Sequence, residues 1–208
     1  MFFREIEKNL RIALTVPQFA GQLFALTDQN REYLKVRLPW LDSVQEIGDT
    51  KRFIREQLLK FAKEEALHLS ILSNNKIVGV VGYNQLDLVN GVGIIGYWLS
   101  EEHTGKGVMT KAVKEVIHMG FGSWPLQKVE IHCAVDNNSS RAIPERLGFR
   151  EEGTIRRTAK VSETHHDHVI YGLLEEEYQD SPIFNADGEG RLAGDAAGMQ
   201  AGLEGMGN

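Results

Sequence analysis

The segment EEHTGKGVMTKA, residues 101–112, combines residue types that suit phosphate binding. Gly105 and Gly107 bracket Lys106 between a strand-like apolar run and a helix-like run that begins at Val108. The first N–H groups of a helix have no intrahelical partner, and the helix dipole there favours an anion. Glycine also lets the backbone approach a diphosphate without a Cβ in the way. The segment is therefore a candidate phosphate cradle, with a plain glycine turn as the alternative.

Two familiar glycine-rich patterns do not match this segment. A P-loop ends in Gly-Lys-[Ser/Thr], but Val108 and Met109 follow Gly107. A dinucleotide fingerprint requires a third glycine, and Thr110 stands at that position. The segment on its own therefore leaves the kind of phosphate ligand open.

A second polar group, NNSS at residues 137–140, follows the next predicted strand and opens a short helix. Asparagine and serine are preferred caps at such a strand-to-helix junction. Pro144 lies within the helix and removes the backbone bond to the carbonyl of Ser140, so we expect a bend. A helix that begins later, near Ala142, with Pro144 in its first turn is the alternative.

The rest of the chain supplies the elements that must position these two segments. Periodicity predicts strands at about 10–16, 66–73, 76–86, 92–100, 127–135, 151–162 and 167–175. It predicts helices at about 17–27, 50–65, 108–121 and 137–148. The stretch 31–42 is also amphipathic, and its pattern stops at Pro39. Asp49 or Thr50 is the expected cap of the second helix. This order predicts a mixed sheet flanked by helices, in the α/β or α+β class.

Composition indicates one globular domain at 1–179 with an acidic tail. The 208 residues are 42% hydrophobic and 25% charged, which suits a single core. Residues 180–208 hold seven of the 21 glycines and a net charge of −4, so we expect a flexible tail there. Of the overall −6, about −2 is left on the domain, which argues against nucleic acid as a partner. No apolar run approaches the ~20 residues that span a bilayer. The N-terminus lacks a signal-peptide pattern. A single cysteine suits a reducing compartment, so we expect a cytoplasmic protein.

The two polar segments with their flanks, YWLSEEHTGKGVMTKA and HCAVDNNSSRAIPERLGF, resemble the GNAT superfamily of N-acetyltransferases. Within it, the chain is similar to the bacterial ribosomal-protein N-terminal acetyltransferases over roughly residues 5–178. The resemblance implies a mixed, mostly antiparallel sheet whose central parallel strands splay apart, flanked by helices. It also implies acetyl-CoA as the co-substrate, entering between YWLS and HCAV.

The resemblance also implies which residues contact the co-substrate. These are Leu99, Gly105, Lys106, Gly107, Val108, Met109, Thr110, Asn137 and Ser140. Thr104 stands where the superfamily usually has glutamine or arginine. This departure removes a long polar side chain but leaves the backbone cradle intact.

Acetyl transfer needs a neutral amine and a proton for the departing thiolate. Many superfamily members use a tyrosine in the second helix as the acid, and the matching position here is Pro144. Ser140 is therefore the candidate catalytic acid, with a helix cap as the plain alternative. Some relatives carry a glutamate base where this chain has Ala159. Three alternatives that the sequence cannot rank are Glu101, Glu163 and Asp167.

A site without an evident base favours an acceptor that is already partly neutral. A protein N-terminal amine has a pKa of ~7.7–8, against ~10.4 for lysine, so about 10–20% of it is neutral at pH 7. We therefore expect acetylation of a protein N-terminus, with ribosomal proteins as the first guess. A small amine (polyamine, amino acid or antibiotic) and a non-catalytic acyl-CoA-binding module are the alternatives. The resemblance further implies a homo-oligomer.

Other conspicuous residues have plain explanations. The histidines in 165–168 suggest a metal site, but only two would share a strand face, so we expect a solvated turn and no metal. Cys133 is expected to be a small core residue. Trp40 either lines the acceptor pocket, as the resemblance implies, or anchors a helix end. Tyr97 and Trp98 lie on opposite strand faces, so at most one should point at substrate.

Overall fold

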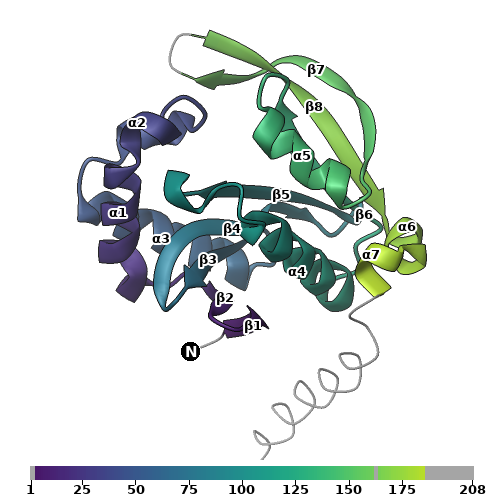
Figure 1. The fold of residues 1–208 in the computed structure, drawn as a ribbon, viewed down its shortest axis with the longest axis horizontal. Helices are drawn as coiled ribbons and strands as arrows, with labels where there is room; N and C mark the ends of the chain where they lie inside the picture. The colour runs from purple at the N-terminus through teal and green to yellow at the C-terminus, as the bar shows by residue number, and fades with distance from the viewer. Residues whose placement is uncertain (1–2, 162–163, 186–208) are drawn as a thin grey trace, which may run out of the picture.

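Eight strands form one sheet in the order β1-β2-β3-β4-β5-β6-β8-β7, flanked by helices (Figure 1). The computed structural model describes residues 3–161 and 164–185. The strands are β1 (Phe3–Glu7), β2 (Leu10–Leu14), β3 (Leu67–Ser73), β4 (Lys76–Asp87), β5 (Val92–Leu99), β6 (Lys128–Ala134), β7 (Arg150–Val161) and β8 (Thr164–Leu174). The α-helices are α1 (Ala20–Gln29), α2 (Arg31–Leu34), α3 (Ile47–Ala62), α4 (Val108–Ser123), α5 (Asn138–Arg146), α6 (Glu175–Asp180) and α7 (Pro182–Asn185). Short 3₁₀ turns span Pro17–Phe19, Pro39–Ser43 and Glu101–His103.

The centre of the sheet contains one parallel pair, β5 and β6, among antiparallel neighbours. Their pairing ends where Ile95 faces Ile131. Both strands continue beyond that point, β5 to Leu99 and β6 to Ala134. The two strand ends therefore diverge and form a V. This confirms the expected mixed, mostly antiparallel sheet with a splayed parallel pair.

The two faces of the sheet are covered by different helices. Helix α4 packs its buried residues, among them Val113 and Ile117, against one face in the larger core cluster. Helices α1 and α3 pack Leu23 and Ile54 against the other face in a second cluster. Strand β6 is buried at alternate positions on the α4 side, ending at Cys133. Its intervening residues therefore face the opposite side of the sheet.

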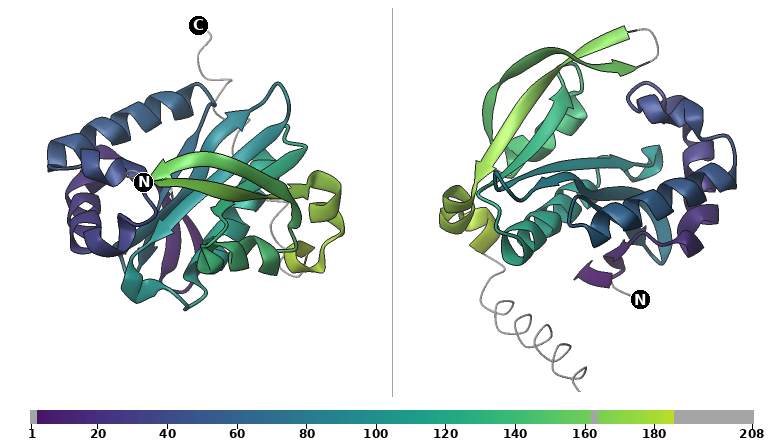
Figure 2. Two further views of the ribbon diagram at one scale, coloured as in Figure 1. Left: turned by 90° about the horizontal axis from the view of Figure 1, so that it is seen from above. Right: turned by 180° about the vertical axis from the view of Figure 1, so that it is seen from behind.

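The β7–β8 hairpin extends beyond the sheet and arches over the molecule toward α2 (Figure 1). Seen from above and from behind, α1–α3 gather at one end of the molecule and α5–α7 at the other (Figure 2). The cleft described below lies between these ends, under the hairpin. The hairpin therefore borders the cleft on one side.

Helix α3 begins earlier than predicted, at Ile47, because its cap is Glu46. The Asp49 carboxylate sits one turn inside and accepts hydrogen bonds from the N–H groups of Gln45 at 2.9 Å and Glu46 at 3.0 Å. These bonds lower the pKa of Asp49 below its usual value. The prediction of Asp49 or Thr50 as the cap was wrong, since the carboxylate closes a capping box from within the helix.

The amphipathic segment at 31–42 is helical only from Arg31 to Leu34. Leu38 is extended, with φ −112° and ψ 99°, as expected for a residue before proline, and a 3₁₀ turn begins at Pro39. Strand β1 was not predicted, because its exposed and half-exposed residues alternate without an apolar face.

The described fold continues past the predicted domain boundary at 179. Helix α7 buries Phe184 against His118 and Tyr178. Residues 186–208, the rest of the predicted tail, lie outside the described residues.

No helix within 3–161 and 164–185 combines the length and apolar character needed to cross a membrane.

Candidate active site

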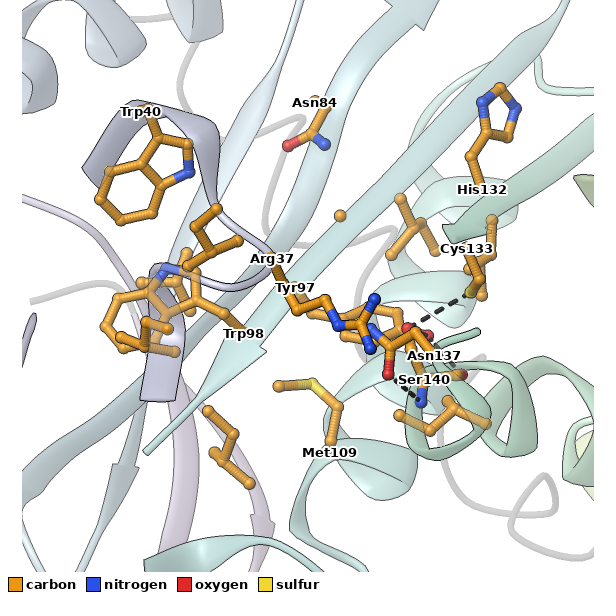
Figure 3. Close-up of a pocket in the computed structure, with 18 of the residues that line it drawn as sticks. Arg37, Trp40, Asn84, Tyr97, Trp98, Met109, His132, Cys133, Asn137 and Ser140 are labelled. Atoms are coloured by element: carbon orange, nitrogen blue, oxygen red, sulfur yellow. Dashed lines mark hydrogen bonds between the residues drawn. The ribbon is translucent and has the colours of Figure 1, made fainter. Parts of the chain in front are cut away.

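A cavity of ≈ 1700 Å³ occupies the V between β5 and β6 and extends to α1–α3 (Figure 3). Met109, Asn137 and Ser140 lie at one end, and Trp40 and Trp98 lie at the other (Figure 3). The cavity therefore joins the two predicted polar segments to an aromatic region on the opposite side of the sheet.

The glycine loop forms the wall of the first end. Gly105 and Gly107 have φ angles of 70° and 74°, in the left-handed region that favours glycine. A Cβ at either position would meet nothing within 4 Å, so the backbone conformation requires glycine and the space beside the loop stays open. Gly107 is the N-cap of α4, and no side chain caps this helix. An open cradle with uncapped helical N–H groups fits a diphosphate.

The second polar segment caps α5 at the opposite arm of the V. Asn137 is the N-cap, and its Oδ1 accepts hydrogen bonds from the Ser140 N–H at 3.2 Å and the Ser139 hydroxyl at 3.0 Å. The helix begins at Asn138, so the alternative of a late start near Ala142 was wrong. Pro144 lies inside the helix, as the first interpretation predicted.

Tyr97 reaches across the V to the Ser140 carbonyl, which has no helical partner because Pro144 lacks an N–H group. Its hydroxyl donates to the Ser140 carbonyl at 3.0 Å, which is the acceptor that Pro144 cannot satisfy. The Ser140 hydroxyl in turn donates to the Tyr97 hydroxyl at 3.2 Å, and it lies 3.3 Å from the Cys133 sulfur. A phenol from β5 thus stands beside Ser140, although no tyrosine is present in the helix.

The groups around Ser140 are uncharged at neutral pH. Burial, and to a smaller extent the neighbouring Cys133, raise the pKa of Tyr97 well above its usual value. Burial raises the pKa of Cys133, despite hydrogen bonds from Ser140 and Tyr97 that lower it. Cys133 is buried, as expected for a small core residue.

The structure brings most of the proposed co-substrate contacts into this one cavity. Its lining includes Leu99, Gly105, Gly107, Val108, Met109, Thr110, Asn137 and Ser140. Lys106 is exposed and does not belong to the lining. The loop therefore presents its backbone, and not its lysine side chain, to the cavity.

The second end of the cavity is aromatic. The ring centroids of Trp40 and Trp98 lie 6.3 Å apart, and those of Phe53 and His68 lie 5.2 Å apart. Trp40 is 40% exposed, so it lines the cavity rather than serving as a core anchor. Tyr97 and Trp98 do lie on opposite faces, but both line the cavity because it passes through the sheet.

Two of the three acidic base candidates are described, and neither belongs to the cavity lining. Asp167 accepts a hydrogen bond from the Arg157 N–H, and the N–H of Glu101 donates to Asn30. Neither lines the cavity, and Glu163 lies outside the described residues. No group of three or more His, Cys, Asp or Glu in 3–161 and 164–185 is arranged for a metal ion.

Two features near the cavity were missed from sequence. Arg37 donates to the Asp136 carboxylate at 2.6 Å and so links the 35–38 loop to the end of β6. His132 lines the cavity, with Nε2 2.7 Å from the Glu130 carboxylate. The alternation of Lys128, Glu130 and His132 along one strand was the available signal.

Comparison with known proteins identifies the family. The family described as acetyltransferase (GNAT) domain matches residues 11–150. YdaF of Bacillus subtilis (strain 168), provisionally named a ribosomal N-acetyltransferase, is 34% identical over 181 residues, which cover 86% of this chain and 98% of YdaF. A ribosomal-protein-serine acetyltransferase of Escherichia coli (strain K12) is 26% identical over 170 residues, which cover 82% of this chain and 95% of the relative.

A solved structure agrees with these matches. The microcin C7 self-immunity acetyltransferase MccE, in complex with acetyl-CoA and AMP, superposes with a TM-score of 0.78 at 30% identity, covering 81% of this chain and 94% of that one. The family match spans the cavity's two polar segments. The resemblance predicted from the sequence is confirmed, and the chain belongs to the GNAT family of N-acetyltransferases.

Proposed function

We propose that this N-acetyltransferase modifies the N-terminal α-amine of a protein, with ribosomal proteins as the first candidate class. The observation that carries the proposal is the charge of the cavity lining, which is not acidic. Its cations are Arg37, Arg52, Lys60, Lys111 and Arg146, and its anions are Asp49, Glu56 and Asp136. A polyamine site would need an excess of carboxylates, whereas a neutral peptide segment can pack on the aromatic lining. The names of YdaF and of the E. coli relative support the same class of acceptor.

Acetyl-CoA supplies the acetyl group in this family. The residues of this chain that would hold it are the backbone of 105–110 at the N-terminus of α4, together with Leu99 and Asn137. These uncapped N–H groups would bind the pyrophosphate. The diverging ends of β5 and β6 would admit the rest of the molecule.

Ser140 is the proposed acid. Its hydroxyl lies at the N-terminal turn of α5, where the helix dipole stabilises negative charge, and Tyr97 holds it by a hydrogen bond. The hydroxyl donates a proton to the departing sulfur as the thioester carbon–sulfur bond breaks. Tyr97 also fixes the α5 turn through the Ser140 carbonyl, so it positions the acid.

A second candidate acceptor is a small amine that carries an aromatic or nucleotide group. MccE was crystallised with AMP, and this cavity pairs Trp40 with Trp98 at 6.3 Å. Aromatic side chains can stack on a base or ring. The third alternative, an acyl-CoA-binding module, predicts co-substrate binding without turnover.

The test measures thiol release from acetyl-CoA with a panel of N-terminal peptides and a panel of small amines, run side by side. We expect turnover with the peptides at rates well above those with polyamines, amino acids or aminoacyl nucleotides. Turnover with small amines alone would overturn the proposed acceptor, and tight binding without turnover on both panels would favour the binding module.

A homo-oligomer and a cytoplasmic location are part of the proposal, and light scattering of the purified chain tests the oligomeric state.

A further inference from the structure

The amine-deprotonating side of the reaction has no residue assigned so far, and the geometry at the apex of the V supplies one. Pairing of β5 with β6 ends at Ile95 and Ile131, so His132 is the first residue of β6 past the apex. Gly96 is its counterpart on β5 and carries no side chain, and a Cβ there would lie 2.1 Å from the side-chain amide of Asn84, which would have to move. His132 thus borders an open space where the two strands begin to separate.

The two faces of β6 at this level carry different groups. Cys133 points to the α4 side, where it contacts the Ser140 hydroxyl at 3.3 Å. His132 precedes it and therefore points to the opposite face of the sheet, where it also lines the cavity (Figure 3). The strand thus separates the proposed acid, Ser140, from an imidazole on the side where the acceptor would enter.

The imidazole is held by a carboxylate. Glu130 Oε2 lies 2.7 Å from His132 Nε2, and Glu130 Oε1 lies 2.8 Å from Lys128 Nζ. Burial raises the pKa of Glu130, but hydrogen bonds from Lys128 and His132 outweigh it and leave that pKa below its usual value. An ionised carboxylate only accepts, so Nε2 carries the proton and Nδ1 presents a lone pair. Within the described residues, Nδ1 forms no hydrogen bond.

The titratable groups around the ring lie on β6, β7 and β8. On β6 and β7, the Lys128 ammonium bridges two carboxylates, Glu130 and Glu152, which leaves one net negative charge beside the ring. On β8, burial and then the neighbouring His132 and His166 lower the pKa of His168, so it is neutral at pH 7. On β4, the facing Asn84 is uncharged. The ionised Glu130 is therefore the group that sets the orientation and tautomer of the ring.

We propose that His132 is the general base, with Glu130 as the residue that positions it. His132 Nδ1 accepts a proton from the acceptor amine as the amide nitrogen–carbon bond forms, and Ser140 Oγ donates a proton to the sulfur as the carbon–sulfur bond breaks. One proton leaves the amine and one reaches the sulfur. Solvent then removes the proton from His132 and restores the one lost by Ser140. This inference rests on the proposed transfer to an amine.

The kinetic test uses His132→Gln, Glu130→Gln and a control, His165→Gln, which changes an exposed histidine of β8 that lies outside the cavity lining. We expect His132→Gln to lower kcat/KM for the amine about 100-fold at pH 7, with much of the loss regained by pH 9 as solvent deprotonates the amine. Glu130→Gln should move the acid limb of the pH–rate profile to lower pH, which a purely structural role would not do. His165→Gln should match the wild type. A wild-type rate and profile in His132→Gln would overturn the proposal.

A second readout needs no acceptor and no turnover. Ring-nitrogen NMR of the CoA-bound protein should show the Nε2–H tautomer of His132 at pH 7.5, and Glu130→Gln should give a mixture of tautomers. An Nδ1–H tautomer in the wild type would overturn the proposal. Titration of CoA binding should give the same Kd for all three variants, and a weakened Kd for His132→Gln would assign it to binding instead. If no amine is acetylated, the proposed function fails, and the ring spectra still decide the state of His132.

Discussion

At the residue scale, the pair Ser140 and Tyr97 defines the acid side of the site. We expect Ser140→Ala to lower kcat on the order of 100-fold, since a positioned acid contributes at least that much. Tyr97→Phe keeps the ring but removes both hydroxyl contacts with Ser140, so it should lower kcat about tenfold, which corresponds to ~1.4 kcal/mol and is of the order expected for lost hydrogen bonds. Steady-state kinetics at saturating acetyl-CoA, with the exposed Ser123→Ala as control, measures both. Unchanged kcat in Ser140→Ala would mean that the hydroxyl only links α5 to Tyr97.

His68 gives a residue-level prediction about stability. Burial, and then the nearby Lys60, lower its pKa from 6.5 to about 4. The neutral ring is favoured in the folded state, so this contribution to stability is present above pH 6.5 and is lost as the pH falls toward 4. The free energy of unfolding should therefore drop by about 2 kcal/mol more between pH 7 and pH 5 in the wild type than in His68→Phe. Urea unfolding at the two pH values measures this. An equal drop in the free energy of unfolding in both proteins would show that His68 protonates freely in the folded state.

At the element scale, the loop that ends in Gly107 and the start of α4 act together. Gly107→Ala places a Cβ on a residue with φ 74°, at a cost of about 1–2 kcal/mol for the left-handed conformation. The distorted loop should raise the Kd for CoA about tenfold and leave kcat at saturation nearly unchanged. Gly122→Ala is the matched control, because it lies in the same helix, lacks a positive φ and has open space at its Cβ. Calorimetry on the two variants separates them, and equal Kd values would exclude the loop from co-substrate binding.

The same scale shows what could be predicted from sequence. The strands at 66–73 and 76–86, which flank the Asn74-Asn75 turn, were predicted because periodicity is a local signal. The stop at Pro39 was also predicted, but the cap of α3 and the early end of α2 at Leu34 were not, since they depend on how Asp49 reaches backward and on how the chain leaves the helix before Leu38. The contact between Tyr97 and Ser140 spans 43 positions, and only the splay of the sheet brings the two residues together.

At the scale of the whole molecule, the cavity passes through the sheet and separates donor from acceptor. The glycine loop and α5 line one end, and Trp40 and Phe53 of the α1–α3 region line the other together with Trp98 of β5. The pair Arg37 and Asp136 links these two halves across the cavity. Arg37→Ala should therefore raise KM for the acceptor several-fold more than KM for acetyl-CoA. Two-substrate kinetics would show this, and an equal effect on both KM values would mean that the link serves the whole cavity rather than its acceptor end.

The central claim is that the acceptor is a protein N-terminal α-amine. The most direct measurement incubates the enzyme and acetyl-CoA with one peptide that carries both a free N-terminus and an internal lysine, and locates the acetyl group by fragment mass spectrometry. We expect the group on the α-amine alone, since that amine is ~10–20% neutral at pH 7 while lysine is neutral less than ~0.1% of the time. Acetylation of the lysine, or of a small amine in preference to the peptide, would contradict the claim.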